Sequence, residues 1–209
     1  MTEPETTALR ICVVGDELAA GSGDPKALGW VGRVVARTES AVPVSAYTLA
    51  VPGETTTALG ARWEAEAQRR LGPEAGEGPG VDRRLVVALG RADVDAGLSL
   101  ARSRLNLANV LDTAAEKKLS VLVVGPPPGT PVQRDRLAEL SAAYADVAGR
   151  RRTPYVDLFT PLEHHEQWLS DLSASGGTLP GQAGYGLIAW LVLHTGWRRW
   201  LGLPEDSPA

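Results

Sequence analysis

Apolar and polar positions follow one another along the chain in a way that predicts strands alternating with helices. Short aliphatic runs bounded by glycine, proline or polar residues are typical of strands that are buried on both faces of a sheet. Five such runs occur, at residues 9–15, 42–49, 85–90, 120–125 and 155–159. Longer segments with apolar residues at helical spacing predict helices at 28–38, 55–71, 98–119, 132–149 and 182–201.

Two of the predicted helices have an apolar face that the spacing assigns. The face of the helix at 98–119 is predicted to consist of Leu98, Ala101, Leu105, Ala108, Ala115 and Leu119. The face of the closing helix is predicted to consist of Leu187, Trp190, Leu191, His194 and Trp197. The segment GPEAGEGPG, from Gly72, predicts a turn-rich surface loop, and residues 160–180 are expected to be irregular.

Strands that alternate with helices are expected to pair in parallel through right-handed crossovers, which gives a doubly wound, three-layer α/β/α sheet. No internal repeat or linker divides the chain, so residues 1–209 are expected to form one domain with an ordered core at about 8–202. Ligands of such sheets bind at the carboxyl ends of the strands. Four loops should therefore face one crevice: those after Gly15, Leu49 and Gly90, and the stretch before Pro180.

Composition narrows the range of functions. The chain has 21 basic and 25 acidic residues, a net charge of -4, so it lacks the phosphate-neutralising surface that a nucleic-acid-binding protein needs. Cys12, the only cysteine, lies in the first apolar run and is expected to be a buried, inert thiol. The N-terminus is acidic and polar, and no apolar run is long enough to cross a bilayer, so we expect a cytoplasmic protein.

The first predicted strand ends in a sequence with a recognisable pattern. The run 9–15 is followed at once by Asp16, Glu17 and Leu18, and then by a glycine-rich loop. An aliphatic strand followed by Gly-Asp-x-Leu resembles the opening block of the SGNH, or GDSL-type, hydrolases, whose fold is flavodoxin-like. In that family the block reads Gly-Asp-Ser-Leu and the serine is the nucleophile. The resemblance therefore implies that Glu17 stands at the nucleophile position.

The next two loops resemble the family's second and third blocks. The second block supplies a glycine N–H to the oxyanion, and Gly53 in VPGETT stands at that position. The third block reads Gly-x-Asn-Asp, with the asparagine as a further oxyanion donor. Residues 90–93 read Gly-Arg-Ala-Asp, so Ala92 stands where the family has the amide.

The last block of the family, Asp-Gly-x-His-Pro, supplies the acid and the base. Pro180, Gly184 and Tyr185 set its register here, so Gly176 stands at the aspartate and Leu179 at the histidine. The resemblance thus covers nearly the whole chain and implies four replacements at catalytic positions. It also implies a crevice formed by Asp16, Glu17, Gly53, Glu54, Gly90, Arg91, Ala92, Thr178 and Leu179.

These replacements favour a protein of hydrolase fold that is inactive as a serine esterase and acts by binding a small molecule or a protein. A hydrolase with a relocated or carboxylate-based centre is the alternative, with Glu17 and Asp93 as catalytic groups and His164 or His165 swinging in. Glu54 is a further carboxylate available to it, and paired carboxylates about 5–9.5 Å apart hydrolyse glycosides. The other interpretation of Glu17 is an ion pair with Arg91 across the crevice.

The sequence gives weaker signals for a metal site or a partner surface than for the crevice. His164 and His165 are adjacent and have no third ligand at a recognisable spacing, so we expect no metal and no cofactor. Of the six tryptophans, three occupy core-like positions: Trp30, Trp63 and Trp190. Trp197 and Trp200, with arginines between them, fit either core packing or a homodimer surface.

Overall fold

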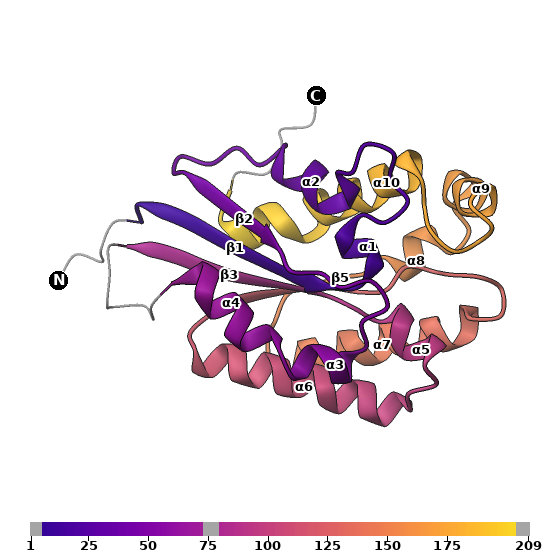
Figure 1. Ribbon diagram of the computed structural model, residues 1–209, viewed down its shortest axis with the longest axis horizontal. Helices are drawn as coiled ribbons and strands as arrows, with labels where there is room; N and C mark the ends of the chain where they lie inside the picture. The colour runs from indigo at the N-terminus through magenta and orange to yellow at the C-terminus, as the bar shows by residue number, and fades with distance from the viewer. Residues whose placement is uncertain (1–5, 73–79, 204–209) are drawn as a thin grey trace.

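The computed structural model describes residues 6–72 and 80–203 and contains a five-stranded parallel sheet in the order β2-β1-β3-β4-β5 (Figure 1). The strands are β1 (Ala8–Gly15), β2 (Val44–Thr48), β3 (Val81–Ala88), β4 (Ser120–Val124) and β5 (Tyr155–Val156). β1 and β3 pair along their whole length, from Ala8 opposite Val81 to Gly15 opposite Ala88. The predicted doubly wound, flavodoxin-like fold is confirmed. Most of the predicted surface loop from Gly72 lies outside the described residues.

Helices cover both faces of the sheet (Figure 1). One layer contains α1 (Glu17–Ala20), α2 (Gly29–Val35), α8 (Phe159–Leu162), α9 (Glu166–Ala174) and α10 (Gln182–Val192), which continues as η1 (Leu193–Trp197) and α11 (Arg198–Leu201). The other contains α3 (Thr56–Gly60), α4 (Trp63–Leu71), α5 (Arg91–Asp95), α6 (Leu100–Glu116) and α7 (Arg134–Arg150). Successive side chains of β1 enter opposite cores, Ile11 with the first layer and Cys12 with the second.

The helix predicted at 55–71 is in fact two helices. α3 ends at Gly60 and α4 begins at Trp63, because Arg62 turns inward to reach Glu54 and the Leu49 carbonyl. Thr55 caps α3 by accepting a hydrogen bond from the Ala58 N–H at 3.2 Å, as its position in the sequence predicts.

The stretch expected to be irregular contains two helices, and the fifth strand is shorter than predicted. β5 ends at Val156, α8 begins at Phe159, and α9 follows. The two helices bury Leu162, Trp168 and Leu172 in the core, and the Trp168 indole donates to the Pro128 carbonyl at 3.2 Å.

The predicted apolar face of the helix at 98–119 is confirmed only at Ala108 and Leu119, which pack against the second core. Leu105 is 51% exposed, and a different set of residues is buried: Ser103, Leu107, Val110, Leu111 and Ala114. The sequence holds two overlapping apolar series at helical spacing, and packing against α3, α7 and β4 selects the one that the prediction did not choose.

The face of the closing helix was predicted only in part. Trp190 is 57% exposed and stacks on His194, with ring centroids 4.5 Å apart, so neither residue belongs to the core. Trp197 and Trp200 are buried in the chain itself, as core packing requires, and the Trp197 indole donates to the Thr38 hydroxyl at 2.9 Å. A homodimer through these two rings stays a prediction, and their burial leaves little of either ring available to a partner.

Two smaller expectations concern single features. Cys12 is buried, and burial raises the pKa of its thiol to about 12, so it is inert as expected. Among residues 6–72 and 80–203, no helix has the length and apolar character needed to cross a bilayer.

Candidate functional site

The carboxyl end of β1 turns directly into the candidate site. Gly15 is required there, because a Cβ on it would lie 2.3 Å from the Ala88 carbonyl oxygen at the end of β3. Asp16 then caps the short helix α1 by accepting a hydrogen bond from the Leu18 N–H at 3.0 Å. Glu17 is therefore the first helical residue, and its side chain projects into the space between the strand ends.

Glu17 meets two other predicted crevice residues. Its Oε2 atom accepts a hydrogen bond from the Gly53 N–H at 2.9 Å, and its Oε1 atom lies 4.0 Å from Nε of Arg91. Gly53 presents its N–H from a turn with φ +73°, a backbone conformation that favours glycine. The predicted pairing of Glu17 with Arg91 is present, and the Glu17 carboxylate also occupies the Gly53 donor.

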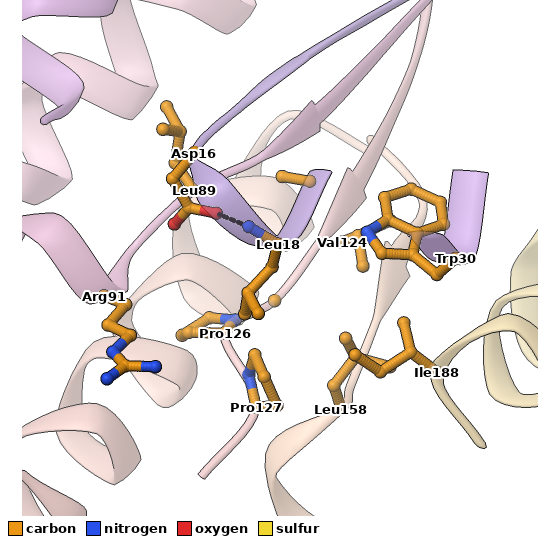
Figure 2. Close-up of a pocket in the computed structure, with 12 residues that line it drawn as sticks. Asp16, Leu18, Trp30, Leu89, Arg91, Val124, Pro126, Pro127, Leu158 and Ile188 are labelled. Carbon is orange, nitrogen blue, oxygen red and sulfur yellow. Dashed lines mark hydrogen bonds between the residues drawn. The ribbon is translucent and has the colours of Figure 1, made fainter. Parts of the chain in front are cut away.

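Arg91 is only 9% exposed and is incompletely paired. Its Nε atom is buried and has no hydrogen-bond partner among the described residues, although Asp95 lies 3.8 Å away on the same helix. The guanidinium lies on the same side of a pocket as the Asp16 carboxyl group (Figure 2). It is a buried cation with donors left over for a ligand.

Asp16 is the most perturbed acid of the site. Burial, and then the neighbouring Glu17 charge, raise the pKa of its carboxyl group to about 7, despite the Leu18 hydrogen bond and the Arg91 charge, which lower it. Asp16 is therefore partly protonated at neutral pH. The sequence places it in the crevice but gives no sign of this shift, because burial is a property of the folded chain.

The rest of the pocket is apolar. Its walls come from α1, α2, the ends of β3 and β4, and the segment before α8, and include the Trp30 ring (Figure 2). The apolar and proline side chains that line it are Leu18, Trp30, Ala88, Leu89, Val124, Pro126, Pro127, Leu158 and Ile188. The space between these walls is small, about 20 Å³, so they admit only a small group unless they move apart.

The two other carboxylates proposed for catalysis have separate partners. Glu54 is buried and binds Arg62 through contacts of 2.5 and 2.6 Å. Asp93 accepts hydrogen bonds of 2.7 Å from both the N–H and the hydroxyl of Thr56, and one of 3.4 Å from Tyr144. Neither has a hydrogen bond or ion pair with Glu17. Both carboxylates hold the structure around the site together.

The candidate histidines lie outside the pocket lining. The side chain of His164 is 80% exposed and lies near Arg134 and Glu163, and His165 is an exposed residue at the start of α9. Thr178 donates to the Ser175 carbonyl at 3.4 Å, and Leu179 packs against the first-layer core. No group of three or more potential metal ligands occurs in the described part of the chain.

The structure is thus that of an α/β protein with a crevice at the carboxyl ends of a parallel sheet, which is where ligands of such sheets bind. Residues 13–187 match the GDSL-like lipase/acylhydrolase family. The chain belongs to this family, which confirms the resemblance drawn from the sequence. None of the curated proteins compared with the chain gives a significant match.

Solved structures with this fold include several esterases. TesA is 22% identical with a TM-score of 0.72, and the match covers 89% of this chain and 97% of TesA. The lipase/acylhydrolase from Enterococcus faecalis is 22% identical with a TM-score of 0.69, covering 95% and 99% of the two chains. The acetylxylan esterase Axe2 from Geobacillus stearothermophilus is 17% identical with a TM-score of 0.72, covering 97% and 99%. At these identities the likeness establishes the fold.

Proposed function

We propose that this protein lacks serine-esterase activity and uses its crevice to bind a small ligand. One observation carries the proposal: the Glu17 carboxylate, at the position where the family has its serine, accepts the hydrogen bond of the Gly53 N–H. That N–H is the oxyanion donor that the family resemblance assigns to Gly53. It is already occupied by a negative charge that belongs to the protein.

Electrostatics and missing groups both oppose acyl transfer. The reaction needs an activated hydroxyl and free donors that point at the developing oxyanion. A substrate oxyanion would have to displace the Glu17 carboxylate and then develop its own charge beside it. Ala92 supplies no amide, and loss of one oxyanion donor lowers the rate by roughly 10²–10³. Leu179, at the position of the family's base, supplies no imidazole.

The pocket indicates the kind of ligand. Its apolar walls suit a short alkyl body, for which the pocket of about 20 Å³ has to widen on binding, while Asp16 and Arg91 offer hydrogen-bonding groups at one end. Asp16 and Glu17 leave little net positive charge around Arg91, so a neutral polar group is favoured over a second carboxylate. A primary amide or a similar uncharged acceptor at the end of a short chain fits both requirements.

A second candidate function rests on Asp16. A carboxyl group with its pKa raised to about 7, beside a second carboxylate, has the properties of a general acid paired with a base or nucleophile. A carboxylate-based hydrolase centred on Glu17, acting on ester or carbohydrate-linked substrates, would use this pair in place of Glu54 and Asp93.

Hydrolysis assays separate the two functions. Short-chain p-nitrophenyl esters, acetylated sugars and p-nitrophenyl glycosides are tested with the wild type, Glu17→Ala and Glu17→Ser. Glu166→Ala serves as the control, because Glu166 is an exposed carboxylate on α9. We expect no turnover above background with any of these proteins. Turnover that is lost in Glu17→Ala and kept in Glu166→Ala would refute the binding proposal and support the carboxylate-based hydrolase.

Binding is tested with hexanamide as the probe, by following the Trp30 indole and Gly53 amide signals in NMR spectra. Both signals are expected to shift saturably. Arg91→Gln is expected to weaken binding, whereas Arg102→Gln, at an exposed arginine of α6, leaves it unchanged. If neither signal moves in the wild type, the proposed ligand class is wrong.

A further inference from the structure

A second concave surface lies at the opposite end of the molecule from the crevice. It is an open groove between the turn that leads into β5 and the last turns of the C-terminal helical segment, with Tyr155, Gly196 and Trp200 among its lining residues. α10 begins beside the crevice, and the segment runs the length of the sheet before α11 reaches this groove. The two sites thus lie at opposite ends of the parallel strands.

Close packing fixes one wall of the groove. A Cβ on Gly196 would lie 2.5 Å from Cγ2 of Val156, so the helical segment contacts β5 directly at this glycine. The π-helical turn η1 includes Gly196 and Trp197, and a turn of this kind often accompanies a functional site. Trp200 follows with its ring against the Arg84 guanidinium, 5.1 Å from the ring centroid.

The turn on the other side is fixed by backbone hydrogen bonds. After α7, the Arg152 N–H donates to the Gly149 carbonyl at 3.1 Å, and the Thr153 N–H donates to the Ala148 carbonyl at 3.0 Å. Arg152 takes the left-handed conformation, φ +54°, that glycine usually occupies in such a helix ending. This arrangement sets Arg152 at the rim of the groove.

Charge is unbalanced in this groove. Arg152 and Arg199 both line it, and the guanidinium group of neither has an ion pair or hydrogen bond with another described residue. Neighbouring arginines are paired, Arg151 with Asp112 at 2.7 Å and Arg84 with Asp82 at 2.7 Å. Among the residues that the structure describes, no acidic residue lines the groove. The two exposed arginines therefore give the groove a positive charge that no described residue of its lining offsets.

An orphaned donor lies in the same wall. The indole Nε1 atom of Trp200 is buried and has no hydrogen-bond partner among the described residues. Such groups are rare in folded proteins, because a buried donor without a partner is destabilising. Because this nitrogen is buried, an acceptor in the groove reaches it only if the ring moves.

We propose that this groove binds the oxyanion group, phosphate or carboxylate, of a small ligand, held by Arg152 and Arg199. Guanidinium groups match both oxyanions through paired N–H donors. The adjoining Trp200 ring gives an apolar surface for the rest of the ligand. This site does not depend on the function proposed for the crevice.

NMR titration of the full-length protein tests the proposal. Trp200→Phe identifies the indole N–H signal of Trp200 among those of the six tryptophans. Inorganic phosphate and citrate are titrated at constant ionic strength, with chloride as the balancing anion. We expect a saturable shift of the Trp200 signal while the Trp30 signal, in the crevice, stays in place. A response to phosphate supports a phosphorylated ligand, and a response to citrate alone supports a carboxylated one.

Variants decide whether the arginines hold the anion. Arg152→Gln and Arg199→Gln are each expected to raise the dissociation constant about tenfold, as the loss of one charge-assisted hydrogen bond implies. Arg102→Gln, an exposed arginine distant in the fold, should leave it unchanged. The proposal is overturned if neither anion shifts the Trp200 signal saturably, or if the two groove variants bind as the wild type does.

Discussion

The buried Asp16 carboxyl group should make the folded protein less stable as the pH rises from 4 to 7. The pKa of this group is raised from the ordinary value of 3.8 to about 7, chiefly by burial and then by the Glu17 charge. Asp16→Asn keeps the shape of the side chain and its acceptor for the Leu18 N–H but cannot ionise. The variant therefore isolates the free energy of placing a charge at this position.

The magnitude follows from the shift. Below pH 4 the carboxyl group is protonated in both the folded and the unfolded chain, so ionisation makes no difference to stability. Between pH 4 and pH 7 the unfolded chain releases this proton and the folded chain keeps it, so the wild type loses about 1.4 kcal/mol of unfolding free energy per pH unit relative to the variant. A shift of about 3 units gives about 4 kcal/mol in total, and the difference is constant above pH 7.

Urea unfolding followed by tryptophan fluorescence, repeated across this pH range, measures the difference. Asp112→Asn is the matched control. The Asp112 carboxyl group is exposed, and hydrogen bonding to Arg151 lowers its pKa, so its contribution is already complete above pH 5 and its difference curve is flat from there to pH 8. A difference between wild type and Asp16→Asn that stays constant, or that shrinks as pH rises from 4 to 7, would refute the reasoning.

Two further predictions concern stability. Glu54→Gln breaks the buried pair with Arg62 and is expected to lower the free energy of unfolding by about 3 kcal/mol. Hexanamide binding, measured by NMR, should stay unchanged. Loss of binding without loss of stability would instead place Glu54 in the ligand site. Trp197→Ala should cost about 3–5 kcal/mol in urea unfolding because the ring is buried, whereas Trp190→Ala should change stability by no more than about 0.5 kcal/mol. Equal losses for the two tryptophans would contradict the assigned burial.

Strands were the easiest elements to predict from the sequence. A strand covered on both faces needs apolar side chains at successive positions, so runs such as VLVV in β4 mark it directly. Parallel pairing then follows from the helices between the strands, whereas the strand order was implied only by the resemblance to a flavodoxin-like fold. β5 is the exception, because only Tyr155 and Val156 pair, and the apolar residues that follow enter α8 and the core beneath it.

Helix faces were predicted less well, for a physical reason. A helix that packs against several elements buries whichever apolar residues its neighbours cover, and α6 has apolar residues on more than one side. The prediction chose the series containing Leu105, while α6 buries the series containing Leu107. In the closing helix, residues 193–197 form a π-helical turn, which has more residues per turn than an α-helix. Residues predicted to share one side by α-helical spacing, such as Trp190 and Trp197, therefore lie on different sides.

The candidate site was predictable as a set of loops and less so as a set of contacts. Parallel pairing of β1 with β2 and β3 brings Glu17, Gly53 and Arg91 together, as their places after strands predict. The same reasoning could not tell that Glu54 and Asp93 turn away. Their side chains bind Arg62 and Thr56, and such choices depend on short-range packing that spacing along the chain does not record.

The hydrogen bond between Gly53 and Glu17 also bears on whether one substitution could recover esterase activity. Glu17→Ser would free the Gly53 donor and supply a hydroxyl, yet the hydroxyl would have no base, because Leu179 stands where the family has its imidazole. Groups of a nucleophilic site act as a unit, so restoring one of them adds little rate. The Nε atom of Arg91 already lacks a hydrogen-bond partner, and removing Glu17 would also take away one of the carboxylates beside it. The carboxylate at position 17 is thus tied to Arg91 and Gly53 as one polar network, and that network is what a ligand in the crevice would meet.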